Sequence, residues 1–178
     1  LGDETVPFRP ASTREAVARG FAFVPEDRKH HGILAPLAVR TNASLPLLPT
    51  RAAVSGWIDS AREISAVDAL LAQLQVRYAD SEQPIAQLSG GNQQKVVIGR
   101  WLRRDVRVWL LDEPTRGVDV AARAGIYALL RSLAAGGAAM LVASSDYEEL
   151  ATLCDRVLVL SNGRLTAEFT PVTLNPTA

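Results

Sequence analysis

The chain has 178 residues, of which 48% are hydrophobic, and its 19 basic and 19 acidic residues give a formal net charge of zero. A chain of this length can bury a hydrophobic core, so we expect one domain with room for a subdomain. The balanced charge gives no electrostatic basis for binding nucleic acid or an anionic membrane surface. A single cysteine excludes an internal disulfide, and no apolar run approaches the roughly 18 residues of a membrane span.

The first regular elements are predicted close to the start of the chain. Ser12 and Glu15 have the spacing of a helix capping box, ahead of an alanine-rich helix that ends at Gly20. Residues 21–24 are predicted to form a strand. The charged segment 25–32 follows, and on its own it is typical of a solvated loop.

The next part of the chain is rich in leucine, alanine and proline, and its prolines exclude a long helix between residues 33 and 57. Asn42 is predicted to cap a short turn in this segment. A regular helix is predicted from Ser60, which forms a second capping box with Glu63, to about Val76. Its apolar residues repeat at helical spacing, which indicates packing against a core.

Residues 88–95 read Leu-Ser-Gly-Gly-Asn-Gln-Gln-Lys and have the features of an anion site. Ser89 can cap a helix that begins near Gly91. Gly90 and Gly91 allow the backbone to approach a phosphate, because neither has a side chain. Free backbone N–H groups and the positive end of the helix macrodipole would then point at the ligand. Taken alone, the segment is more typical of an ordinary serine-capped helix with a glycine-rich start.

The segment that follows this helix supplies two carboxylates. Residues 108–111 are an apolar strand, and Asp112 and Glu113 come directly after it. Open parallel sheets bind their ligands at the carboxyl ends of the strands. One acid can therefore hold Mg²⁺ and the next can polarise a water molecule. The alternative is that both acids cap the next turn.

The rest of the chain alternates between helices and strands. We predict a helix at 121–133, a strand at 138–143, a helix at 148–154, and two strands at 156–160 and 165–169 joined by a tight turn.

Residues 88–95 and 108–119 together resemble the signature motif, the Walker B motif and the D-loop of ATP-binding-cassette (ABC) ATPases. The motifs occur in the order and at the spacing of that family. The resemblance extends over about residues 2–170. It implies an α/β P-loop-NTPase core with a mostly parallel sheet and an α-helical signature subdomain.

The resemblance also divides the chain and predicts a gap in its sheet. It places the ATPase core in residues 1–39 and 102–170, the helical signature subdomain in 40–101 and a tail in 171–178. The family's P-loop strand lies in the middle of its sheet and has no counterpart here, so we expect a cassette truncated before the Q-loop strand. The strands at 138–143 and 156–160 would flank the gap, with 108–111 and then 21–24 outside the former.

The family's site residues can be carried over position by position. The resemblance implies that Glu113 is the catalytic carboxylate and that Asp112 holds Mg²⁺. Residues expected to contact ATP are Ser89, Gly90, Gly91, Gln93, Glu26, Asp119 and Ser145.

Three features depart from the family pattern. Lys29 and Lys95 are the only lysines, and neither ends a Gly-Lys-Ser/Thr phosphate-binding loop. Glu26 stands where the Q-loop usually has glutamine, and Ser145 where most cassettes have a histidine that contacts the γ-phosphate. We therefore expect the chain alone to be inactive as an ATPase.

The run Pro-Glu-Asp-Arg-Lys at 25–29 and the missing histidine resemble the second cassette of sugar-importer ATPases of the ribose, xylose and galactoside type. The implied partners are a first nucleotide-binding cassette, which would hold ATP and Mg²⁺, and membrane permease subunits near the segment after the Q-loop. No nucleic acid and no direct sugar contact are expected. The implied location is peripheral, on the cytoplasmic face of the inner membrane.

Two alternatives to this function stay open. The chain could be a structural fragment without a nucleotide role, which the missing P-loop favours. It could also belong to an ATPase head of the SMC/Rad50 type, which shares the signature and Walker B motifs. Such heads continue into long heptad repeats, and this chain has none.

Overall fold

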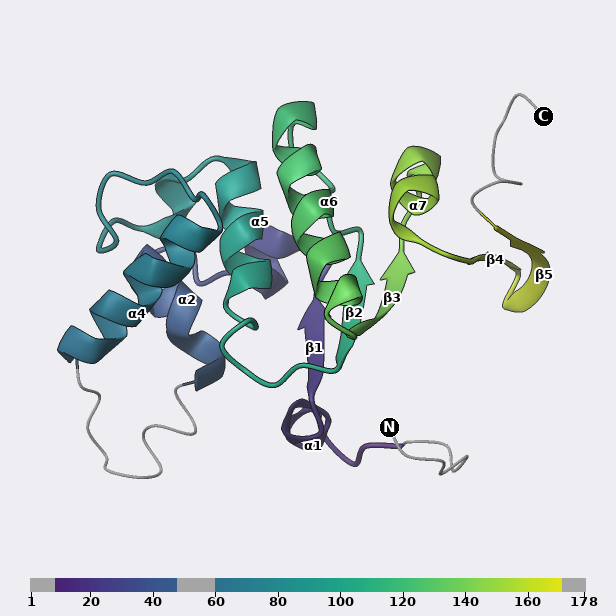
Figure 1. Cartoon of the computed structure of the whole chain (residues 1–178), viewed down its shortest axis with the longest axis horizontal. Helices are drawn as coiled ribbons and strands as arrows, with labels where there is room; N and C mark the ends of the chain where they lie inside the picture. Colours follow the sequence, from purple (N-terminus) through teal and green to yellow (C-terminus); the bar gives the residue numbers. More distant parts are fainter. Residues whose placement is uncertain (1–8, 48–59, 171–178) are drawn as a thin grey trace.

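The computed structural model describes residues 9–47 and 60–170 of the chain. The helices are α1 (Thr13–Ala18), α2 (Val39–Ser44), α4 (Ser60–Gln73), α5 (Gly90–Gly99), α6 (Val120–Ala135) and α7 (Tyr147–Leu153), and the strands are β1 (Phe21–Val24), β2 (Val108–Asp112), β3 (Ala139–Ala143), β4 (Val157–Ser161) and β5 (Arg164–Phe169). Helices α2, α4 and α5 form one group beside the sheet β1–β3, α6 lies across that sheet, and α7 leads to the hairpin β4–β5 (Figure 1). None of the described helices is long and apolar enough to cross a membrane.

The main sheet is parallel and has the strand order β1-β2-β3. Phe23 lies opposite Leu110, which in turn lies opposite Leu141. This order confirms the prediction that residues 108–111 lie next to the strand at 138–143, with 21–24 outside them. The carboxyl ends of the three strands consequently share one edge of the sheet, where Asp112 stands.

The two faces of this sheet differ in their burial. Trp109 and Leu111 are 1% and 2% exposed and belong to the core that α6 covers. On the opposite face, Phe23 is 50% and Leu141 is 65% exposed, with the half-buried Leu110 between them. We call these three residues the bare sheet face. Parallel strands that are apolar on both sides are typical of sheets covered on both faces.

The first helix is capped as its sequence predicts. The Ser12 hydroxyl accepts a hydrogen bond from the Glu15 backbone N–H at 3.2 Å, and the Glu15 carboxylate accepts one from the Ala11 N–H at 2.8 Å. The helix ends at Ala18, two residues earlier than predicted. Gly20 adopts φ +86°, a left-handed conformation that favours glycine after a helix.

The structure corrects the role predicted for Asn42. This residue lies inside α2 and is fully buried, so it does not cap a turn. Its amide accepts a hydrogen bond from the Leu34 N–H at 2.8 Å and donates to the carbonyls of Leu34, Leu37 and Ala38. The side chain therefore satisfies the backbone that leads into α2, a contact that turn statistics do not reveal.

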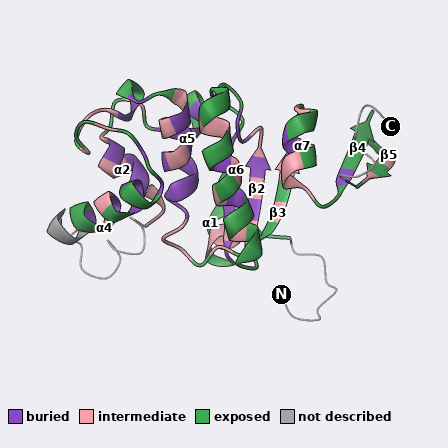
Figure 2. Ribbon diagram, turned by 45° about the horizontal axis from the view of Figure 1, so that its top comes forward, coloured by how far each residue is buried: buried purple, intermediate pink, exposed green. Residues whose placement is uncertain are grey.

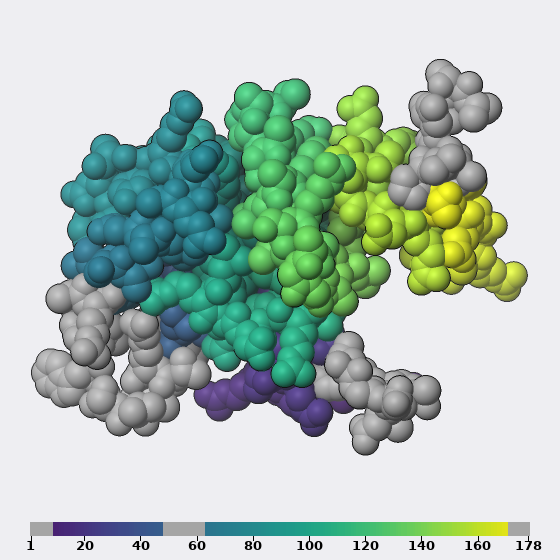
Figure 3. All heavy atoms as spheres, in the orientation of Figure 1, coloured from purple at the N-terminus to yellow at the C-terminus, as the bar shows by residue number. Residues whose placement is uncertain are grey.

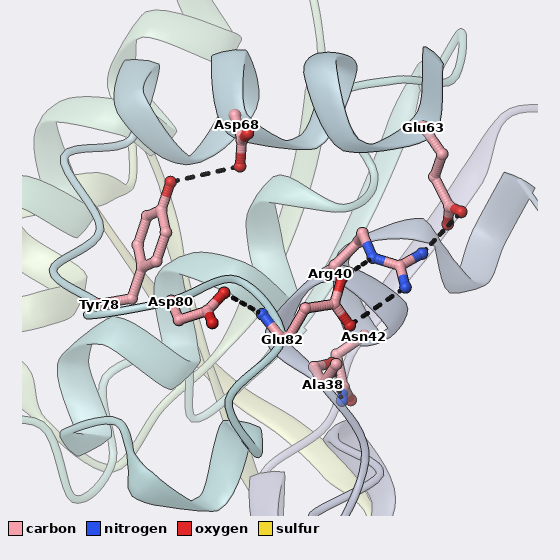
Figure 4. Close-up of polar contacts among 8 residues, drawn as sticks. All are labelled: Ala38, Arg40, Asn42, Glu63, Asp68, Tyr78, Asp80 and Glu82. Atoms are coloured by element: carbon pink, nitrogen blue, oxygen red, sulfur yellow. Dashed lines mark hydrogen bonds and ion pairs between the residues drawn. The ribbon is translucent and has the colours of Figure 1, made fainter. Parts of the chain in front are cut away.

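The polar residues around α4 also differ from the predicted capping box. Ser60 already lies within the helix, and Glu63 is 5% exposed. The Glu63 carboxylate accepts a hydrogen bond from Arg40 Nη1 at 3.0 Å, and Arg40 also pairs with Glu82 through Nε at 2.5 Å (Figure 4). The bond with Glu82 raises the pKa of Arg40 above its usual value. A single guanidinium thus ties α2 to α4 and to the loop that precedes α5.

The hairpin β4–β5 does not join the main sheet in the described part of the chain. Its strands pair with each other, antiparallel, and form a separate two-stranded sheet. The hairpin lies beyond α7, at the far end of the molecule from α4 (Figure 3), and most of its residues are exposed (Figure 2). The edge of β3 that faces away from β2 therefore has no strand partner among the described residues.

Unpaired strand edges leave backbone N–H and C=O groups without partners, so we expect this region to open most easily. In the chain by itself, amides in β3 and β4 should exchange hydrogen faster than amides in α4 and α5, where the buried core is continuous. Hydrogen exchange followed by mass spectrometry measures this difference. Uniform strong protection across residues 138–160 in a dilute monomer would contradict it.

Candidate functional site

The predicted anion-binding turn forms the start of α5. Ser89 has an extended backbone and caps the helix, and its hydroxyl accepts hydrogen bonds from the backbone N–H of Asn92 at 3.5 Å and from the Asn92 side chain at 3.0 Å. Ser89 is exposed and Gly90 is half-buried. The first N–H groups of a helix have no partner within it, so this turn presents donors at the protein surface. We call Ser89–Gly91 the signature turn.

The two glycines of this turn are required by close packing as well as by access for a ligand. A Cβ atom on Gly90 would lie 2.8 Å from the Gly117 carbonyl oxygen. A Cβ atom on Gly91 would lie 2.6 Å from the Cβ of Ala122, in the first turns of α6. Neither glycine has a positive φ. The glycines therefore let α5 approach the loop after β2 and α6 more closely than any side chain would allow.

Gln93, predicted to contact ATP, is only 6% exposed. Its amide nitrogen donates to the carbonyls of Ile85 at 3.2 Å and Leu88 at 3.0 Å. Its amide oxygen accepts a hydrogen bond from Arg28 Nε at 3.2 Å. In this conformation the side chain holds the segment before the signature turn, and its contact with ATP stays a prediction.

The end of β2 places the predicted catalytic carboxylate beside the loop after β3. Glu113 adopts φ +46°, which is uncommon for a residue with a side chain. Its backbone N–H donates to the Ala143 carbonyl at 2.8 Å, and its carboxylate accepts a hydrogen bond from the Ser145 N–H at 2.8 Å. The structure therefore brings Glu113 and Ser145 together, through the backbone of the serine and not through its hydroxyl.

Asp112, the predicted metal ligand, ends β2 at the ligand edge of the sheet and is half-buried. Within the described residues no group of three or more His, Cys, Asp or Glu side chains could hold a metal ion. Mg²⁺ is usually bound by one or two carboxylates together with water and substrate phosphates. A single carboxylate at this edge fits such an ion.

A polar cleft of about 460 Å³ opens beside Glu113. The cleft is lined by Glu113, Thr115, Arg116, Gly117, Arg123, Ser145, Asp146 and Glu149. Arg123 pairs with Asp146 at 2.7 Å, and the Thr115 hydroxyl donates to the buried Glu149 carboxylate at 2.6 Å. Asp146 also caps α7, and the backbone N–H of Glu149 is the main cause of its lowered pKa.

Sequence reasoning missed Thr115, Arg123 and Glu149. Thr115 and Glu149, which are hydrogen-bonded to each other, lie 34 residues apart in the sequence. Arg123 and its partner Asp146 lie 23 residues apart. No local pattern links residues that far apart. The acidic residues in the first turn of the helix at 147–153 were the one signal for this cleft in the sequence. Acidic residues are also common at helix N-termini in general, so the signal did not point to a site.

Glu26 and Asp119, both expected to contact ATP, form contacts within the protein. Glu26 forms an ion pair with Arg116, and both side chains are largely exposed, so the pair adds little stability. Asp119 caps α6, because its carboxylate accepts a hydrogen bond from the Ala122 N–H at 2.9 Å. One oxygen of Asp119 lies 3.6 Å from the position that a Cβ atom would take on Gly91. Nucleotide contacts by either residue stay predictions.

Comparison with known proteins gives the same answer as the motifs. A family model described as ABC transporter matches residues 3–116. The ribose import ATP-binding protein RbsA 3 of Rhizobium meliloti (strain 1021) is 45% identical over 160 residues, which are 90% of this chain and 32% of that protein. The xylose import ATP-binding protein XylG of Burkholderia ambifaria is 49% identical over 164 residues, which are 90% of this chain and 31% of that protein. The chain thus spans about a third of the length of these curated relatives.

A solved structure shows the same fold. The dimeric ATP-binding cassette MJ0796, in a post-hydrolysis state bound to ADP and Pi, superposes with a TM-score of 0.70 at 24% identity, over 85% of this chain and 62% of that one. This likeness confirms the predicted α/β P-loop-NTPase fold with its parallel sheet. The family model covers well over half of the chain. The chain belongs to the ABC transporter family.

Proposed function

We propose that the chain is an ATP-binding part of an ABC sugar importer and that it presents the signature turn to ATP held by the P-loop of a partner cassette. The observation that carries this proposal is the exposed, serine-capped start of α5, in a chain without a Gly-Lys-Ser/Thr loop of its own. Sugar import is supported by the names of the ribose and xylose relatives.

The signature turn acts on phosphate through its backbone. The unpaired N–H groups of the first turn and the positive end of the α5 macrodipole favour an anion, typically by about 0.3–1 kcal/mol at an exposed site. The Ser89 hydroxyl lies at the same surface and can add a hydrogen bond. In the transition state of phosphoryl transfer, charge is spread over the three equatorial oxygens of the terminal phosphoryl group, so donors fixed in place before the reaction can stabilise it.

Asp112 and Glu113 would serve a second ATP site, to which this chain contributes the carboxylates. We call this part of the chain its own half-site and propose that it is the weaker of the two. Asp112 would hold Mg²⁺, and the ion would neutralise phosphate charge. Glu113 would orient the attacking water, but its carboxylate already accepts the Ser145 N–H. Position 145, where most cassettes have a histidine, is a serine in this half-site. We therefore assign most of the chain's contribution to the signature turn.

The partners follow from this assignment. A cassette with an intact P-loop supplies ATP, and permease subunits receive the resulting movement through the segment after residue 32. The chain would sit peripherally on the cytoplasmic face of the membrane and would not contact the sugar. The bare sheet face is a second surface that such a partner, or another part of a longer protein, would cover.

The chain by itself is expected to show no ATP turnover and at most weak ATP binding, because it has neither a phosphate loop nor its lysine. Isothermal titration with Mg-ATP and a phosphate-release assay on the purified 178-residue chain measure both properties. Turnover together with micromolar affinity would show that the chain has a complete site and would overturn the proposal.

A further inference from the structure

The loop after β1 and helix α5 are joined by two buried arginines that reach in opposite directions. Arg28 begins the π-helical turn Arg28–Gly32 and donates to the side chains of Gln93 and Gln94 on α5, at 3.2 and 3.3 Å. Arg100, at the other end of α5, donates back to the Gly32 carbonyl at 2.6 Å. Both arginines are 8% exposed. The loop and the helix are thus fastened at two points along α5.

Burial without a counter-ion is costly for a guanidinium, which suggests that these arginines have a specific task. In the described part of the chain, no carboxylate lies within ion-pair distance of Arg28 or Arg100. Burial lowers the pKa of Arg28, and it lowers the pKa of Arg100 to about 10. Both groups remain charged at neutral pH. Their hydrogen-bond partners are neutral amide and carbonyl oxygens, and the Arg100 guanidinium also lies 6.0 Å from the centre of the Trp101 ring.

Arg28 differs from Arg100 in what lies beside it. Its Nη2 atom lies 3.0 Å from the position that a Cβ atom would take on Gly90. Its hydrogen bond also orients the Gln93 amide, which holds the carbonyls of Ile85 and Leu88 just before Ser89. Arg28 therefore lies against Gly90 and, through Gln93, holds the segment that leads into Ser89.

We propose that Arg28 is a positioning residue for the signature turn: it sets the place of the Ser89–Gly91 donors and makes that place depend on the loop after β1. This inference rests on the proposed function of the turn. A positive charge next to the positive end of α5 also strengthens attraction for phosphate. Movement of the loop would be transmitted to the turn, because the Arg28 side chain donates its hydrogen bonds to the α5 side chains of Gln93 and Gln94.

Arg100 supplies the matched control. Arg100 is buried to the same extent as Arg28 and joins the same two elements. It lies ten residues beyond Gly90 at the other end of α5, which is about 15 Å at 1.5 Å per residue. Arg28→Gln and Arg100→Gln should both weaken the attachment of the loop. Only the Arg28 variant should disturb the donors of the signature turn.

The test uses the chain assembled with a P-loop-bearing partner cassette. We expect Arg28→Gln to lower kcat/KM for ATP at least roughly tenfold, which corresponds to about 1.4 kcal/mol, while Arg100→Gln stays within about threefold. Arg28→Lys should fall between wild type and Arg28→Gln, since an ammonium keeps the charge but lacks the planar fork that reaches both glutamines. Hydrogen exchange of the amides at 90–93 should accelerate in Arg28→Gln and not in Arg100→Gln.

The outcomes separate this inference from the function on which it rests. Urea unfolding of each variant measures the loss of stability. If kcat/KM falls equally in both glutamine variants, in proportion to lost stability, Arg28 is a structural clamp and the inference is wrong. In the same assembly Ser89→Arg tests the turn itself: if that change has no effect on turnover, the proposed function fails together with the inference.

Discussion

Replacing Ser89 with arginine in a complete two-cassette assembly is expected to abolish ATP-driven transport. Ser89 is exposed at the start of α5, so a long cationic side chain there would occupy the space in front of the backbone donors without disturbing the core. Loss of a single preorganised donor typically lowers turnover about 100- to 1,000-fold. Uptake of labelled sugar into vesicles, with ATP supplied on the side of the cassettes, measures the effect.

The matched substitution is Glu113→Gln. It removes the negative charge from the chain's own half-site and keeps the size of the side chain. We expect a smaller loss of transport, because that half-site has serine at position 145 and its Glu113 carboxylate already accepts the Ser145 N–H. Ser65→Arg, on the exposed side of α4, controls for adding an arginine. Equal losses from Ser89→Arg and Glu113→Gln would count against the assignment, and a larger loss from Glu113→Gln would reverse it.

Gly91→Ala is expected to destabilise the fold by about 2 kcal/mol, within the range of roughly 1–3 kcal/mol for overpacked cores. The added Cβ would lie 2.6 Å from the Cβ of Ala122, and neither atom can rotate away. The helices α5 and α6 would have to separate, and the signature turn would move with them. Equilibrium unfolding of the chain in urea measures the change in the free energy of unfolding.

Gly125→Ala is the matched control, because it adds the same methyl group to a helical glycine in α6. Its Cβ would meet Lys95 Cε at 3.7 Å, an ordinary contact with a flexible side chain. Alanine is favoured over glycine in helix interiors by about 1 kcal/mol, so this variant should be more stable than wild type. If Gly91→Ala leaves the free energy of unfolding unchanged or raises it, α5 and α6 do not approach each other as closely as the structure shows.

Much of this fold follows from local patterns. The serine cap at residue 89, the apolar strand that ends in two acids, and the glycine pair at 136–137 each specify structure over a few residues, and the elements appear where those patterns predict them. The order of the strands came from the family resemblance, because no local pattern shows which strands become neighbours.

The remaining features depend on contacts between distant segments. Arg28 bonds to residues 65 and 66 positions away, so its charged loop gave no sign that the arginine is buried. Asn42 and Glu63 have the composition of caps, but tertiary contacts use their side chains differently. Gly91 was predicted to make room for a phosphate, and the structure adds the neighbouring helix as a second reason for glycine.

The central claim is that the signature turn of this chain meets ATP held by another cassette. The most direct measurement is photo-cross-linking with an ATP analogue that carries a short photoreactive group on its γ-phosphate, in an assembly whose only P-loop belongs to the partner. We expect the label on residues 89–92 of this chain, and its loss in Ser89→Arg. Labelling confined to residues 112–116 and 145, or no labelling of this chain at all, would contradict the account.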